Sequence, residues 1–95
     1  MRLTPEQAEV IRQKVRRHLG EHARIWLFGS RTDDQRRGGD VDLYVEPAQP
    51  AGLVERLHCS SELADALDPQ VDLIVQQPGR ELPIYRIAKQ RGVLL

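Results

Sequence analysis

Residues 27–45, LFGSRTDDQRRGGDVDLYV, contain the pattern that decides the fold. The apolar run Ile25–Phe28 is rich in β-branched and aromatic residues and stops at Gly29-Ser30, which predicts a strand buried on both faces. No side chain from 30 to 39 is apolar, so these residues are expected to form a loop. Residues 41–45 then alternate apolar with more polar side chains, the period of a strand with one apolar face.

Three aspartates on the predicted strands are the candidate metal ligands. Asp40 and Asp42 are two residues apart on one strand, so their carboxylates share a face and repel each other unless a cation intervenes. Magnesium suits such a pair, because it prefers oxygen ligands and takes few of them from protein. Asp72 interrupts the apolar run Val71–Val75, where an unpaired buried charge would cost several kcal/mol. If these strands are neighbours, three carboxylates can hold two metal ions roughly 3.5 to 4 Å apart.

Phosphate groups would be bound where the first strand ends. Gly29 allows a close approach of the backbone, and Ser30 and free backbone N–H groups can donate hydrogen bonds to phosphate oxygens. Nearby arginines, Arg31 and the Arg36-Arg37 pair, could neutralise further phosphate charge. The Arg36-Arg37 pair has an equally good account as part of a solvated loop.

The remaining segments predict helices around a small sheet. Thr4 precedes a helix over residues 5–19, and a second helix is expected over about 50–67. After the strand Val71–Val75 a final amphipathic helix runs on from Leu82, with Gly92 as its cap. The expected fold is α/β (α+β), a small mixed three-stranded sheet flanked by helices, with exposed sheet edges.

Length and composition narrow the classes of function. The 95 residues are expected to form a single domain, 1–95, and 14 Lys plus Arg balance 14 Asp plus Glu, which disfavours direct nucleic acid binding. Neither an apolar leader nor a membrane-length run is present, so a cytoplasmic location without membrane contact is expected. The single cysteine, Cys59, excludes an internal disulfide and a structural zinc site.

Histidines and aromatic residues have structural interpretations. His18, His22 and His58 lack ligand spacing and are expected to be surface or structural residues. Trp26 and Phe28 belong to a continuous apolar run, which favours a place in the core over a role in base stacking.

Two short motifs, Phe28-Gly29-Ser30-Arg31 and Gly39-Asp40-Val41-Asp42-Leu43, resemble the nucleotidyltransferase superfamily that includes DNA polymerase β. Within it, the chain length, the first helix, the Asp72 strand and the tail Ile84 to Leu95 look like the minimal nucleotidyltransferase (MNT) group. The chain departs at Gly39, a position that is often Ser in relatives. The carboxylates of the motif are intact.

The resemblance implies a site and a reaction. Asp40 and Asp42 would ligate two Mg²⁺ ions, and Asp72 would complete the metal site and accept a proton. Gly29 and Ser30, with Arg31 beside them, would bind the triphosphate of ATP, the substrate. The leading hypothesis is transfer of AMP to a hydroxyl of a protein partner, a HEPN-type toxin, so that the chain acts as an antitoxin.

Two alternatives belong to other classes. The chain could neutralise its partner by contact alone, with a vestigial acidic triad, since small size and open sheet edges suit a binding module. Transfer to a small molecule such as an aminoglycoside is a weaker option, because such enzymes usually have a second domain for the acceptor. Homo- or hetero-oligomers are expected, because association would cover the sheet edges and the apolar Val93–Leu95.

Overall fold

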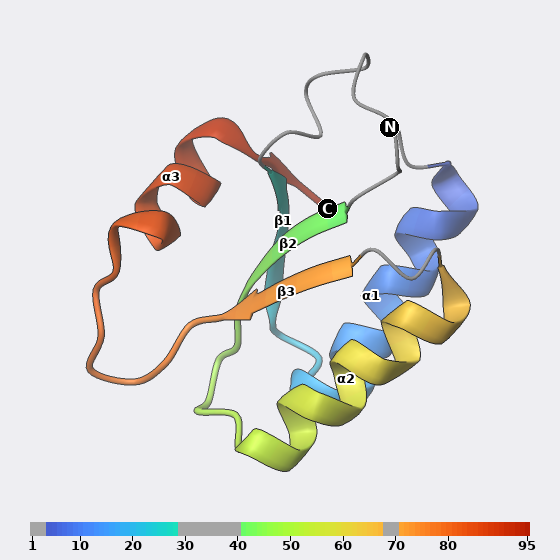
Figure 1. Ribbon diagram of the computed structural model, residues 1–95, viewed down its shortest axis with the longest axis horizontal. Helices are drawn as coiled ribbons and strands as arrows, with labels where there is room; N and C mark the ends of the chain where they lie inside the picture. The colour runs from blue at the N-terminus through green and yellow to red at the C-terminus, as the bar shows by residue number, and fades with distance from the viewer. Residues whose placement is uncertain (1–3, 29–40, 68–70) are drawn as a thin grey trace.

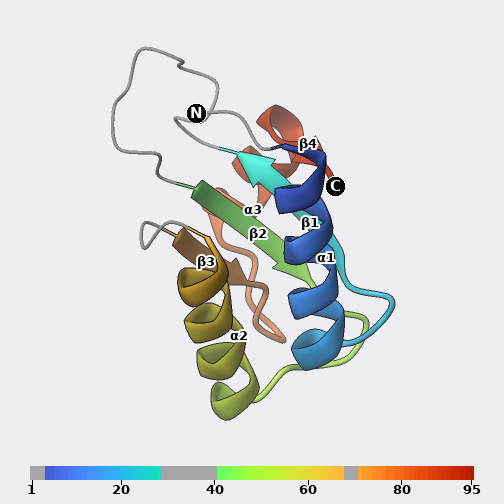
Figure 2. The same cartoon turned by 90° about the vertical axis from the view of Figure 1, so that its right-hand side faces the viewer.

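A computed structural model describes residues 4–28, 41–67 and 71–95. The elements along the chain are α1 (Pro5–Leu19), β1 (Arg24–Phe28), β2 (Val41–Glu46), α2 (Leu53–Ala66), β3 (Val71–Val75), α3 (Pro83–Arg91) and β4 (Val93–Leu94). They form three layers, with α1 and α2 on one side of the sheet and α3 on the other (Figures 1 and 2). In these described ranges no helix is long and apolar enough to cross a bilayer.

The sheet is mixed, as predicted, and has four strands in the order β3-β2-β1-β4. β1 is antiparallel to both β2 and β4, whereas β2 and β3 are parallel. The α/β fold class is therefore confirmed, with one strand more than expected. β4 was missed because two residues are too short to show a period, and its pairing with Trp26 and Leu27 covers part of an edge that was expected to be open.

Each face of the sheet has its own apolar cluster. Leu43 and Val45 of β2 join α1 and α2 in the first cluster, which also contains Ile11, Val15 and Leu63. The residue between them, Tyr44, points the other way and packs in the second cluster with Trp26, Phe28, Tyr85 and Ala88. The alternation along β2 thus decides which side chains face α3. Trp26 and Phe28 are buried core residues, as expected.

The helix boundaries follow from local caps. The Thr4 hydroxyl accepts a hydrogen bond from the Gln7 N–H at 3.1 Å, and the Thr4 N–H donates to the Gln7 side chain at 2.9 Å, which starts α1 as predicted. Gly20 ends α1 at a φ of 107°, a value that suits glycine. α2 begins at Leu53, later than the expected residue 50, because Gly52 is its N-cap.

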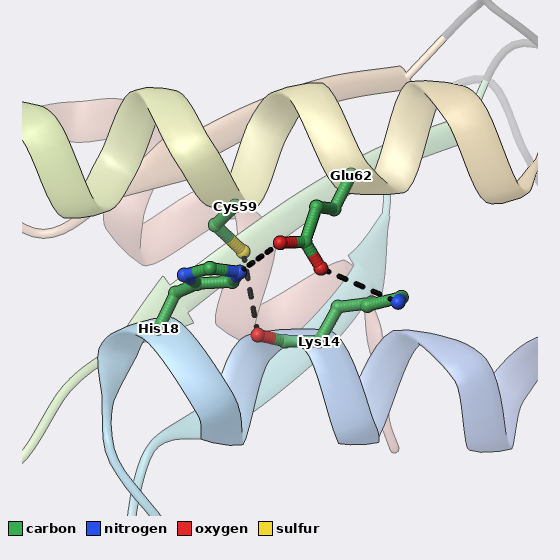
Figure 3. A network of polar contacts seen from close by, with 4 residues as sticks. All are labelled: Lys14, His18, Cys59 and Glu62. Carbon is green, nitrogen blue, oxygen red and sulfur yellow. Dashed lines mark hydrogen bonds and ion pairs between the residues drawn. The ribbon is translucent and has the colours of Figure 1, made fainter.

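A polar cluster joins α1 to α2 (Figure 3). Glu62 on α2 contacts His18 Nε2 at 2.8 Å and Lys14 Nζ at 3.3 Å, both on α1. The buried Cys59 thiol lies 3.9 Å from the Lys14 carbonyl oxygen, and burial raises its pKa to about 11. His18 and Cys59 thus contribute to helix packing, which is the structural role expected for His18.

The Glu62 contacts predict an acid-sensitive contribution to stability. The hydrogen bond from His18 outweighs the effect of burial and, with the Lys14 ion pair, holds the pKa of Glu62 below its ordinary value of 4.5. Because the folded pKa is lowered, the stabilisation is present above the ordinary value and is lost as the pH falls through the lowered one. The free energy of unfolding, measured by urea titration from about pH 6 to about pH 3, should fall less in Glu62→Gln than in wild type. Glu81→Gln, which changes an exposed glutamate, is the control and should fall as much as wild type. An equal fall of the free energy of unfolding in Glu62→Gln and wild type would contradict this account.

A pair of leucines on α2 tests the first apolar cluster. Leu63 is fully buried, whereas Leu57 on the same helix is 58% exposed. Leu63→Ala should lower the free energy of unfolding by about 2 to 5 kcal/mol, because it leaves a cavity. Leu57→Ala should change it by less than about 0.5 kcal/mol. Similar losses in urea unfolding would show that α2 does not pack as described.

Candidate active site

Parallel pairing brings two of the predicted carboxylates together. Asp42 on β2 and Asp72 on β3 are Cα partners in the register of the two strands. Both lie on the face of α3, since Leu43 and Leu73 beside them pack in the cluster on the opposite face. The expectation that these strands are neighbours is therefore confirmed, and the two carboxylates share one face of the sheet.

The surroundings of Asp72 differ from the sequence-based prediction. Its side chain was expected to be buried within an apolar run, at a cost that demanded a partner. It is instead exposed, because β3 is an edge strand and the second cluster lies farther along the sheet. The prediction that Asp72 is a buried charge is thus wrong, and Asp72 remains a candidate ligand because of its position opposite Asp42.

The end of β1 lies beside the same pair. Phe28, the last described residue of β1, is the Cα partner of Asp42, so β1, β2 and β3 come together at this end of the sheet. The other predicted site residues, Gly29, Ser30, Arg31 and Asp40, lie outside the described residues.

The donor set at this end suits a magnesium ion. Two carboxylates on adjacent strands repel each other, and a divalent cation relieves that repulsion while leaving room for phosphate oxygens in its shell. Within residues 4–28, 41–67 and 71–95, no group of three or more His, Cys, Asp or Glu is placed to hold a metal. Asp42 and Asp72 are two of the three expected ligands, and Asp40 is the third.

The opposite end of the same face carries a buried carboxylate that the sequence argument missed. Glu46 is 9% exposed and accepts hydrogen bonds from the Tyr44 hydroxyl at 2.8 Å and from Arg24 at 3.2 Å. Lys89 of α3 lies 3.1 Å from its second oxygen. Burial, together with the bond to Glu46, raises the pKa of Tyr44, which therefore stays protonated. The only sequence signal was that Glu46 continues the alternation of Asp42 and Tyr44.

The Glu46 network fastens α3 to the sheet. The Tyr44 and Tyr85 rings stack at 5.1 Å between centroids, and Lys89 lies 5.6 Å from the Trp26 ring. A cavity of about 250 Å³ lies beside Glu46, lined by Gln76, Glu81 and Arg86 among others. Four residues of strand, about 13 Å, separate Glu46 from Asp42. The face therefore has one closed end under α3 and one end where the carboxylates are accessible.

Three helices on a mixed sheet, with paired carboxylates beside a strand end, are compatible with a nucleotidyltransferase fold. A family model described as Polymerase beta, Nucleotidyltransferase matches residues 9–95. The chain therefore belongs to the polymerase β-like nucleotidyltransferase family. A comparison with curated proteins finds no match.

Solved structures of toxin–antitoxin complexes share the fold. One contains a tri-AMPylated HEPN toxin of Shewanella oneidensis with its MNT antitoxin; the similarity has a TM-score of 0.69 at 24% identity and covers 93% of this chain and 66% of that one. A second is an MntA complex with two aspartates changed to glutamate, with a TM-score of 0.73 at 23% identity over 93% and 70% of the two chains. A third, a toxin–antitoxin complex with AMP-PNP, has a TM-score of 0.76 at 25% identity over 97% and 72%. The chain thus spans about two thirds of the length of these proteins.

Metal binding at Asp42 and Asp72 can be tested by thermal unfolding. Adding Mg²⁺ with a non-hydrolysable ATP analogue should raise the Tm of wild type, because ligands that bind only the folded state stabilise it. Asp42→Asn should abolish the rise and Asp72→Asn should reduce it, since each removes a negative ligand. Asp65→Asn, an exposed aspartate of α2, is the control and should behave as wild type. An undiminished rise in Asp42→Asn would exclude Asp42 as a ligand.

Proposed function

We propose that this chain transfers AMP from ATP to a hydroxyl of a protein partner of the HEPN toxin type, and so acts as an antitoxin. The observation that carries the proposal is the pairing of Asp42 with Asp72 on one face of the sheet, beside the end of β1. Family membership supports nucleotidyl transfer. The acceptor is supported by the fold that the chain shares with MNT antitoxins crystallised with their toxins.

In this proposal each carboxylate has a role. Asp40 and Asp42 would hold two Mg²⁺ ions and Asp72 would complete the site, while Gly29, Ser30 and Arg31 would bind the triphosphate. Bound magnesium supplies neutralisation of phosphate charge and a lower pKa of the acceptor hydroxyl. The acceptor oxygen forms a bond to the α-phosphorus of ATP as the bond to the leaving pyrophosphate breaks. Asp72 accepts the hydroxyl proton, a role compatible with its exposed position.

The proposed acceptor is a protein because Asp72 lies on an edge strand at an open end of the sheet face. α3 covers the sheet face at the Glu46 end, and Asp72 is open to solvent. A large partner can therefore present its hydroxyl at this end. ATP as the nucleotide is supported by a similar solved complex that contains AMP-PNP.

Transfer of label from ATP tests the proposal. Incubating the chain with α-labelled ATP, Mg²⁺ and the product of the neighbouring gene should label that partner. Asp42→Ala should reduce the labelling by at least about 100-fold, because electrostatic stabilisation of this kind contributes several kcal/mol. Asp65→Asn should retain it. Absence of labelling by the wild-type chain under any metal condition would refute the enzymatic proposal.

A double variant separates catalysis from neutralisation by contact. The chain has exposed apolar side chains on α2, Leu53, Val54 and Leu57, that could take part in such a contact. If the Asp40→Ala, Asp42→Ala double variant still relieves the toxicity of the partner in cells, contact is sufficient. Loss of relief, with the complex still formed in gel filtration, supports catalysis.

A further inference from the structure

The C-terminal end of α3 lies against the end of β1 that is nearest to the carboxylates (Figure 1). Gly92, the cap of α3, is packed so closely that an added Cβ would lie 2.8 Å from the Leu27 carbonyl oxygen and 3.1 Å from the Phe28 Cβ. Its φ of −87° suits any residue, so close approach rather than handedness explains the glycine. Phe28 is the partner of Asp42, and Arg91 directly precedes Gly92, so Arg91 lies near the carboxylate end of the sheet.

The phase of α3 places Arg91 on the flank opposite to the residue that contacts Glu46. Tyr85 and Ala88 face the sheet, and Lys89 contacts Glu46, which lies at the far end of β2 from Asp42. At 3.6 residues per turn, Arg91 is rotated by about 200° from Lys89 and thus occupies the opposite flank of the helix. It shares this flank with Ile84, seven residues earlier, which packs beside the second cluster.

Arg91 also has its charge available. Its side chain is exposed, and within the described ranges it forms an ion pair with no acidic residue, whereas Lys89 is paired with Glu46. An arginine suits phosphate better than a lysine does, because its planar guanidinium can donate two parallel hydrogen bonds. Arg91 therefore has a side chain suited to phosphate and lies near the carboxylate end of the sheet.

We propose that Arg91 binds the triphosphate of the nucleotide held at Asp42 and Asp72, and so supplies part of the positive charge that the site requires. This inference rests on the proposed function. None of the arginines suggested by the sequence, Arg31, Arg36 and Arg37, is close to Arg91 along the chain, so Arg91 adds a cation from the C-terminal part of the sequence.

A purely structural role for Arg91 predicts something different. A cation in the last turn of a helix interacts favourably with the helix dipole, and Arg91 and Lys89 both occupy that turn. In that case Arg91→Lys should behave as wild type, and Arg91→Ala should weaken folding without discriminating between ligands. Arg86→Ala is the matched control, because Arg86 is an exposed arginine of the same helix that lines the cavity beside Glu46.

Ligand affinity measured by calorimetry on the full chain distinguishes triphosphate binding by Arg91 from a purely structural role. The ligands are a non-hydrolysable ATP analogue, AMP and inorganic tripolyphosphate, each with Mg²⁺. Arg91→Ala should weaken binding of the ATP analogue and tripolyphosphate about tenfold or more, since a charge-assisted hydrogen bond is lost, and should change AMP binding much less. Arg91→Lys should recover part of the affinity, and Arg86→Ala should match wild type.

Three other outcomes would overturn either the assignment of Arg91 or the proposed function. If wild type binds the ATP analogue and Arg91→Ala binds it equally well, the assignment of Arg91 fails and the proposed function stands. If Arg91→Ala weakens the binding of all three ligands equally and lowers the free energy of unfolding in urea, Arg91 has a structural role. This result also overturns the assignment of Arg91 to the triphosphate. If wild type binds no nucleotide with any metal, the proposed function itself fails.

Discussion

The parallel pairing of β2 with β3 is the constraint on which the site depends. It places Asp42 opposite Asp72, although two like charges at directly opposed positions destabilise a sheet. The register is maintained by the other face, where Leu43, Val45 and Val75 are buried against α1 and α2. A slip of one residue would expose these side chains and bury the carboxylates, so the apolar cluster holds the charges together.

The two ends of the sheet face that α3 covers differ in structure: one end holds α3 in place, and the other carries the candidate site. At one end the Glu46 carboxylate has donors from three elements, Arg24 of β1, Tyr44 of β2 and Lys89 of α3, and α3 is fixed there. At the other end Asp72 is exposed. α3 ends at Gly92, which packs against Leu27 and Phe28 of β1. The helix therefore comes close to the carboxylate end of the sheet without covering Asp72. The proposed function, in which the site admits a nucleotide and a protein acceptor, requires an open end of this kind.

Much of the secondary structure could be predicted because its signals are local. The Thr4 and Gln7 caps, the stripe of Ile11 and Val15, and the alternation through Leu43 and Val45 each depend on residues close together in the chain. Features that depend on distant contacts were missed or misjudged. β4 exists because two residues meet β1, and the exposure of Asp72 follows from where the second cluster ends.

Sequence was sufficient to identify the family and the aspartate pattern, because motif order and strand period are written along the chain and a family model matches residues 9–95. Tertiary packing settled which groups share a face. Three such contacts are the pairing of Asp42 with Asp72, the burial of Glu46 beneath α3 and the approach of Gly92 to Phe28. Each joins residues that are at least 30 positions apart in the sequence. No local period encodes such encounters, since they arise only when helices bury their apolar faces against the sheet.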